Sequence, residues 1–182
     1  MTNKLFMDLK FTNYSLDGKI ISLCLRDNTK FDRVLYLENS DLLPEDATGW
    51  VVGDTCMSNR ILSFGTPTFD TNIEAQLSAL AGFSALIEAY LGNYSRVQIL
   101  TNNPMAWMFF VSIFGDIEDL PNVIDPIPVF LPSVFVTLGL ASNTNPEGYI
   151  SEEAFSPIDY NSLHDTNKIK KAYVKALKLL TQ

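Results

Sequence analysis

Residues 4–12 read Lys-Leu-Phe-Met-Asp-Leu-Lys-Phe-Thr, and their side chains alternate in type with a period of two. Successive side chains of a β-strand point to opposite faces of the sheet, so this period predicts a strand and assigns each residue to a face. One face is wholly apolar and consists of Leu5, Met7, Leu9 and Phe11. The other face carries Phe6, Asp8 and Lys10, which puts two opposite charges on the same side of the strand.

Two more apolar segments follow, at residues 19–25 and 33–37, and both are rich in Ile, Leu, Val and Tyr. Short polar turns separate the three segments, so we expect an antiparallel three-strand meander. Residues 41–70 contain Pro44 and three glycines, which interrupt any long element. Only a short helix and a strand at 60–64 fit in that segment.

The sequence changes to a helical period at residue 71. Thr71 and Glu74 fit a capping box, and Gly92 supplies a stop, so the pattern predicts a helix over residues 71–91. The positions that recur at steps of three and four are Ile73, Leu77, Leu80, Ser84, Ile87 and Leu91.

A strand is predicted at residues 96–101, and a helix follows it directly. Asn103 suits the N-cap, Pro104 suits the first helical position, and Gly115 is expected to end the helix. A strand that feeds a helix in this way favours parallel pairing with an earlier strand.

Two further helices are predicted at residues 132–140 and 161–180, the first of them opened by Pro132. The expected inward positions of the last helix are Leu163, Ile169, Ala172, Tyr173, Ala176, Leu177 and Leu180. The order of elements predicts an α/β protein with an antiparallel three-strand meander, parallel strands and flanking helices, in a single domain of residues 1–182.

Composition agrees with one globular domain, because 47% of the 182 residues are hydrophobic and 19% are charged. The longest apolar stretches, 105–114 and 127–141, are too short or too interrupted by proline to span a bilayer. The first residues reach Asp8 after only three apolar side chains, so no signal peptide is expected and a cytoplasmic location is predicted. Two cysteines and a single histidine argue against a disulfide framework or a zinc site.

The charge is distributed unevenly along the chain, whose net charge is −8. Residues 1–167 hold eight basic and 21 acidic side chains, whereas residues 168–182 hold five lysines and no acid. An acidic body repels phosphate, so a non-specific grip on nucleic acid would have to come from the C-terminal segment. The alternative interpretation of these lysines is a solvated helix face.

Three stretches, residues 6–12, 99–107 and 162–169, resemble the motifs of the ribonuclease H-like 3′-to-5′ exonucleases that use four acids and a histidine (the DEDDh type). The likeness is greatest to the compact exoribonuclease-like branch of bacteria and phages. These exonucleases carry Asp-x-Glu in the first strand, an Asp-Trp pair near the start of the helix after the fourth strand, and His-x-x-x-x-Asp on the last helix. The resemblance implies a ribonuclease H-like mixed sheet over nearly the whole chain.

The resemblance also implies a chemistry for two retained positions. In the family, carboxylates hold two divalent cations, Mg²⁺ or Mn²⁺, which clamp the attacking and leaving oxygens of a phosphoryl displacement. Asp8 matches one of those carboxylates, and His164 matches the general base that activates the attacking water.

The other three acids of the family are replaced. Lys10 stands where the first motif has glutamate, Ala106 where the second has aspartate, and Ile169 where the last has aspartate. Reversing one charge about 4 Å from a divalent ion changes the Coulomb energy by about 16 kcal/mol at a dielectric constant of 20, an upper limit. Asp165 lies four residues before the expected ligand position, so we expect it to be a poor substitute.

The leading hypothesis is therefore an exonuclease-like protein that has lost two-metal catalysis, needs no cofactor and acts by binding. Its partner is expected to be a protein or a second copy, met by the acidic surface, or a nucleic-acid end docked against Lys10, Lys168 and Lys171. Without a metal, Asp8 would pair with lysines and His164 would cap or pack the helix.

The alternative hypothesis is an active exonuclease that uses Mg²⁺ or Mn²⁺. Its ligands would be Asp8 together with Asp165 or Asp159, and His164 would be the base. A structural or inhibitory protein of a different fold is a third possibility.

Overall fold

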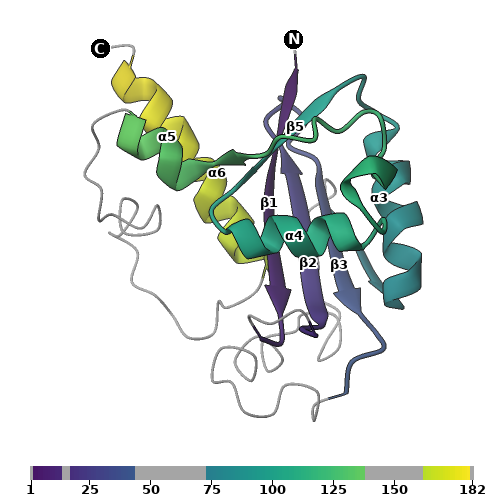
Figure 1. Ribbon diagram of the computed structural model, residues 1–182. Helices are drawn as coiled ribbons and strands as arrows, with labels where there is room; N and C mark the ends of the chain where they lie inside the picture. Colours follow the sequence, from purple (N-terminus) through teal and green to yellow (C-terminus); the bar gives the residue numbers. More distant parts are fainter. Residues whose placement is uncertain (1, 14–16, 44–72, 138–161, 181–182) are drawn as a thin grey trace.

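The computed structural model describes residues 2–13, 17–43, 73–137 and 162–180, drawn in colour in Figure 1. It contains a six-stranded sheet in the order β4-β3-β2-β1-β5-β6. The strands are β1 (Asn3–Phe11), β2 (Ile20–Asp27), β3 (Val34–Asn39), β4 (Ile73–Ser78), β5 (Val97–Thr101) and β6 (Val129–Phe130). The helices are α3 (Phe83–Leu91), α4 (Pro104–Ser112), α5 (Leu131–Thr137) and α6 (Ser162–Leu180), with short 3₁₀ turns at η2 (Leu80–Gly82) and η3 (Ile117–Asp119).

The sheet is mixed, as the sequence predicts. Strands β1, β2 and β3 form the antiparallel meander. Strand β5 pairs with β1 in parallel, and β6 pairs with β5 in parallel. Strand β4 adds a third parallel pair, because it lies beside β3 at the other edge. The chain therefore has an α/β fold with helices on both sides of the sheet (Figure 1).

Apolar side chains cover both faces of the sheet, and the alternation of β1 decides which of its residues enter each face. The odd-numbered side chains from Leu5 to Phe11 pack with α3 and α4. Phe6, on the opposite face, packs with α5 and α6. Because Asp8 and Lys10 share the face of Phe6, they lie under α6.

The predicted helix over residues 71–91 is wrong in its first half. Residues 73–78 form β4, which pairs with β3 from Val34↔Ile73 to Asn39↔Ser78, and the helix α3 begins only at Phe83. Thr71 lies outside the described residues, and the side chain of Glu74 pairs with Arg33 at 2.8 Å instead of capping a helix. Gly92 ends α3 as expected.

The other predicted elements can be compared in the described residues. Asn103 caps α4 by accepting a hydrogen bond from the Met105 amide at 2.9 Å, with Pro104 at the first position. The helix ends at Ser112, three residues before Gly115, which adopts a positive φ of 111° in the following turn.

The predicted helices at 132–140 and 161–180 correspond to α5 and α6. Four predicted inward residues of α6 are buried: Ile169, Ala172, Tyr173 and Ala176. Leu163 packs at the edge of the core, whereas Leu177 is 41% exposed, so its prediction is wrong. Residues 44–70, with the strand expected at 60–64, lie outside the described residues, as do 138–140 and the side chain of Leu180. In the described part of the chain, no helix has both the length and the hydropathy to cross a membrane.

Candidate functional site

The candidate site lies between the Asp8 face of β1 and the first turns of α6. Asp8 is 4% exposed although it carries a carboxylate, and Asp165 on α6 is 5% exposed. Buried carboxylates are rare unless they are paired, so the partners of these two groups define the site.

Lys10 joins the two carboxylates. Its Nζ lies 3.0 Å from Asp8 Oδ2 and donates a hydrogen bond to Asp165 Oδ2. Lys168 donates to the other oxygen of Asp165, with Nζ 3.2 Å from Oδ1. We refer to Asp8, Lys10, Asp165 and Lys168 as the Lys10 network. Each side chain is at most 19% exposed, and the two cations balance the two anions.

Polar side chains of the neighbouring strands extend the site across the same face of the sheet. The register pairs Lys10 with Ser22 and then Ser22 with Glu38, so these three residues form a row across β1, β2 and β3. Glu38 is fully buried and accepts a hydrogen bond from the Tyr36 hydroxyl. Nothing in the period of the sequence distinguishes Glu38 from a solvent-facing residue, so the sequence alone does not predict its burial.

The start of α6 is fixed to this row by hydroxyl groups. Ser162 Oγ donates to Ser22 Oγ at 3.0 Å, and Thr166 Oγ1 donates to the carbonyl of Cys24 at 3.5 Å. Cys24 lies beside Asp8 in the register, and its complete burial raises the pKa of its thiol to about 12. The thiol is therefore neutral at physiological pH and does not add a charge to the site.

Two of the positions where the resemblance implies an acid, 106 and 169, belong to the apolar core. Ala106 packs with Leu5 and Met7, on the face of β1 opposite to Asp8. Ile169 is 1% exposed and packs with Phe6 and other residues under α6. Neither position supplies a polar atom to the Lys10 network.

Asp165 reaches the network because it lies one helical turn before Ile169. Residues four apart share a helix face, so a side chain at 165 points to the sheet as Ile169 does. The structure brings the Asp165 carboxylate to Lys10 beside Asp8, and whether it could replace a metal ligand stays a prediction. His164, the residue directly before Asp165, is half-buried.

The donor set does not fit a pair of divalent cations. Hard cations such as Mg²⁺ require oxygen ligands, whereas a lysine ammonium only donates hydrogen bonds and repels a cation. Here such an ammonium contacts both carboxylates. Within the described ranges, no group of three or more His, Cys, Asp or Glu side chains is arranged to hold a metal.

The three lysines expected to meet nucleic acid fall into two groups. Lys10 and Lys168 belong to the network and are largely buried. Lys171 is exposed on another side of α6 and lines a separate pocket. Comparison of the chain with protein-family models found no match, and comparison with curated proteins found none either.

Proposed function

We propose that this chain is a ribonuclease H-like exonuclease homologue that has lost two-metal hydrolysis and acts by binding. The observation that carries the proposal is the contact of the Lys10 ammonium with the carboxylates of both Asp8 and Asp165. In this proposal the lysine supplies the positive charge that a metal ion supplies in an active relative.

The arrangement of the sheet supports the proposal. An antiparallel meander of β1, β2 and β3, with β5 and β6 parallel on the other side of β1, agrees with the mixed sheet that the resemblance implies. Asp8 lies in the middle of β1, and His164 lies in the first turn of the last helix, as the motifs require. Strand β4 is an addition to that expectation.

The surroundings of the replaced acids also support a loss of catalysis. A lysine at position 10 adds a charge of the wrong sign, and the core packing of Ala106 and Ile169 removes two oxygen ligands. The chain keeps one family acid and a histidine. Protein–protein contact through the acidic surface and docking of a nucleic-acid end are both compatible with a binding role.

One observation favours the alternative, an active exonuclease that uses Mg²⁺ or Mn²⁺. The carboxylates of Asp8 and Asp165 converge on a single nitrogen atom, so they already lie close together. A rotation of Lys10 away from them would leave two carboxylates facing one position, with His164 nearby in the sequence.

A nuclease assay separates the two functions. The full chain is incubated with 5′-labelled single-stranded RNA and DNA in Mn²⁺ or Mg²⁺, alongside Asp8→Ala and a control, Glu118→Ala, which removes an exposed carboxylate from η3. We expect no shortening of the oligonucleotides by any of the three proteins. Shortening from the 3′ end that is lost in Asp8→Ala and kept in Glu118→Ala would establish the alternative.

A further inference from the structure

A pocket lies at the C-terminal end of α3, on the side of the sheet opposite to α6 (Figure 1). It has a volume of about 380 Å³ and we refer to it as the α3 pocket. Its lining residues are Glu88, Leu91, Gly92, Tyr94, Pro121 and Val123. They come from the last turn of α3, from the turn that follows it and from the segment between η3 and β6. The α3 pocket shares no residue with the Lys10 network.

Hydrogen bonds hold the walls of the α3 pocket in place. The carbonyl of Val123 accepts from the amide of Val97 at 2.8 Å, which joins one wall to β5. The amide of Tyr94 donates to the carbonyl of Leu91 at 2.9 Å, and its hydroxyl donates to Asp27 Oδ2 at 3.0 Å. Asp27 is 1% exposed, so this bond fixes the orientation of the tyrosine side chain. A ligand would therefore enter a preformed pocket and lose little affinity to the ordering of these groups.

Two sources of negative charge meet at the α3 pocket. Glu88 is exposed, and no described residue forms a hydrogen bond or an ion pair with its carboxylate. The last turn of α3 contains no basic residue, so no side chain of that turn offsets the partial negative charge at the C-terminal end of the helix. A cation in the pocket would gain from both the carboxylate and the helix dipole.

The turn that leads into the pocket adds further negative charge. Asp116, Glu118 and Asp119 are exposed and precede Pro121 by two to five residues. Asp116 and Asp119 accept hydrogen bonds from backbone amides of this turn, which do not cancel their charges. Two residues span at most about 7 Å, which is within the screening length of about 8 Å at physiological ionic strength. Asp119 therefore acts on a cation that lies beside Pro121.

The arginines in this part of the fold already have partners. Arg96 follows Tyr94 by two residues, and Arg33 acts electrostatically on the same tyrosine. Arg96 pairs with Asp125 at 3.2 Å, and Arg33 pairs with Glu74 at 2.8 Å. Since each guanidinium is matched by a carboxylate of its own, neither arginine neutralises the acids of the α3 pocket and of η3.

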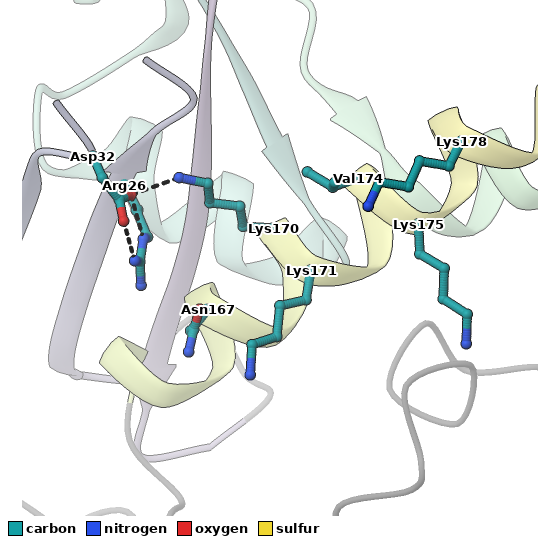
Figure 2. A pocket seen from close by; sticks show the side chains of 8 residues that line it. All are labelled: Arg26, Asp32, Asn167, Lys170, Lys171, Val174, Lys175 and Lys178. Carbon is teal, nitrogen blue, oxygen red and sulfur yellow. Dashed lines mark hydrogen bonds and ion pairs between the residues drawn. The ribbon is translucent and has the colours of Figure 1, made fainter. Parts of the chain in front are cut away.

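The pocket beside α6 differs in this respect. Figure 2 shows Asp32 next to Arg26 and Lys170, and ion pairs join its carboxylate to both of them. Charges of that pocket are thus engaged within the chain. At the α3 pocket, by contrast, the Glu88 carboxylate is available to a partner.

The lining of the α3 pocket suits an arginine side chain. Leucine, valine, proline and tyrosine side chains form most of the wall, and they can contact the methylene stem of a long side chain. Glu88 can pair with its cationic head. A guanidinium forms two parallel hydrogen bonds to a carboxylate and stacks on aromatic rings, whereas an ammonium is a more strongly hydrated point charge. Arginine is also enriched in protein interfaces, where lysine is depleted.

We propose that the α3 pocket binds an arginine side chain from a basic segment of a protein partner. The inference rests on the proposed function in one respect, because both give the chain a binding role, and it adds the class of the partner. A basic segment is complementary to a chain whose net charge is −8, so long-range attraction would speed the encounter. The pocket would then select arginine.

The test is fluorescence anisotropy with fluorescein-labelled hexa-arginine amide in about 50 mM KCl, where screening is weak. Hexa-lysine and hexa-citrulline amides are the comparison peptides. We expect the arginine peptide to bind most tightly and the uncharged citrulline peptide to give no saturable signal. Glu88→Gln should weaken binding of the arginine peptide about three- to fivefold, as expected for one exposed ion pair. Glu88→Lys should weaken it roughly tenfold or more, because it places a like charge in the pocket.

The matched control is Asp17→Asn, which removes the same charge from an exposed turn after β1. Asn3 pairs with Val97 beside the pocket, and Phe11 lies about 26 Å further along β1, so the turn is remote from the pocket. We expect Asp17→Asn to keep the affinity of the parent within twofold. Circular dichroism checks that all variants are folded.

Three results would overturn the proposal. These are an absence of binding by hexa-arginine, equal weakening by Glu88→Gln and Asp17→Asn, and equal affinity for the arginine and lysine peptides. In the last two cases, attraction to the acidic chain as a whole would account for binding. The same protein is also tested for shortening of oligonucleotides. Shortening would contradict the loss of hydrolysis whatever the peptides do, whereas a lack of peptide binding without shortening would overturn only the inference about the α3 pocket.

Discussion

Replacement of Lys10 by methionine removes the charge that joins Asp8 to Asp165 while it keeps an unbranched side chain of similar length. The two carboxylates are 6% and 7% exposed, so water replaces the lost partner poorly. Removal of one partner from a buried ion pair typically costs about 3–5 kcal/mol. Because Lys10 is 16% exposed and Lys168 still contacts Asp165, we expect a loss near the lower end, about 3 kcal/mol.

Urea and thermal denaturation measure this loss. A change of 1 kcal/mol moves the midpoint of a domain of this size by about 2–4 °C, so Lys10→Met should melt about 6–12 °C below the parent. The control is Lys168→Met, which removes the lysine whose Nζ lies 3.2 Å from Asp165 Oδ1, and it should cost less than about 1 kcal/mol.

A double-mutant cycle then attributes the effect to the carboxylate. Asp165→Asn in the Lys10→Met background should cost less than Asp165→Asn in the parent, with a coupling energy on the order of 1–2 kcal/mol. A Lys10→Met variant as stable as the parent, or additive effects in the cycle, would refute the inference that Lys10 neutralises these buried acids.

Three further predictions concern the scaffold. The guanidinium of Arg26 lowers the pKa of Asp32 to about 2, so this carboxylate stabilises the fold above its unfolded pKa of 3.8, and the stabilisation is lost as the pH falls toward 2. Asp32→Asn should therefore lower the free energy of unfolding by about 1 kcal/mol at pH 7 after solvent screening. Urea titrations should show this difference shrinking between pH 4 and pH 2. Burial raises the pKa of the Cys24 thiol to about 12. In a variant that lacks Cys56, we therefore expect iodoacetamide to label Cys24 only in urea. Rapid labelling of the native protein would contradict the burial of Cys24. Asn103→Ala should lower stability by about 1 kcal/mol because the Met105 amide loses its cap, whereas Asn103→Asp should keep the melting temperature, and equal melting of both would exclude the cap.

Periodicity predicts the fold wherever an element has one unambiguous pattern. The alternation of residues 4–12 correctly assigns both faces of β1, and the Asn103-Pro104 pair correctly marks the start of α4. Residues 73–78 are different, because Ile73 and Leu77 are four apart, a spacing that suits one face of a helix and one face of a strand equally. Residues 73–78 form a strand because they pair in parallel with β3 at the edge of the sheet. The local sequence of residues 73–78 does not reveal this pairing.

The site was predictable only in part, for a similar reason. The sequence places Asp8 and Lys10 on one face of β1, which is the local half of the Lys10 network. The other half depends on how α6 is rotated against the sheet. The burial of Ser162, Asp165, Thr166 and Ile169 follows a single helical stripe, and this stripe is the signal that could have identified Asp165 as an inward residue. Arg26 and Lys170 meet through Asp32, 138 positions from Lys170, which no spacing rule anticipates.

The most direct test of the central claim is calorimetric titration of Mn²⁺ and Mg²⁺ into the full chain, with Asp8→Ala as control and Lys10→Glu as the restored counterpart. If Lys10 takes the place of the cation, the parent gives no saturable heat at millimolar metal. Lys10→Glu, which gathers three carboxylates, gives a saturable signal with Mn²⁺. A saturable signal in the parent that disappears in Asp8→Ala would contradict the claim, because the carboxylates would then hold a metal despite the lysine.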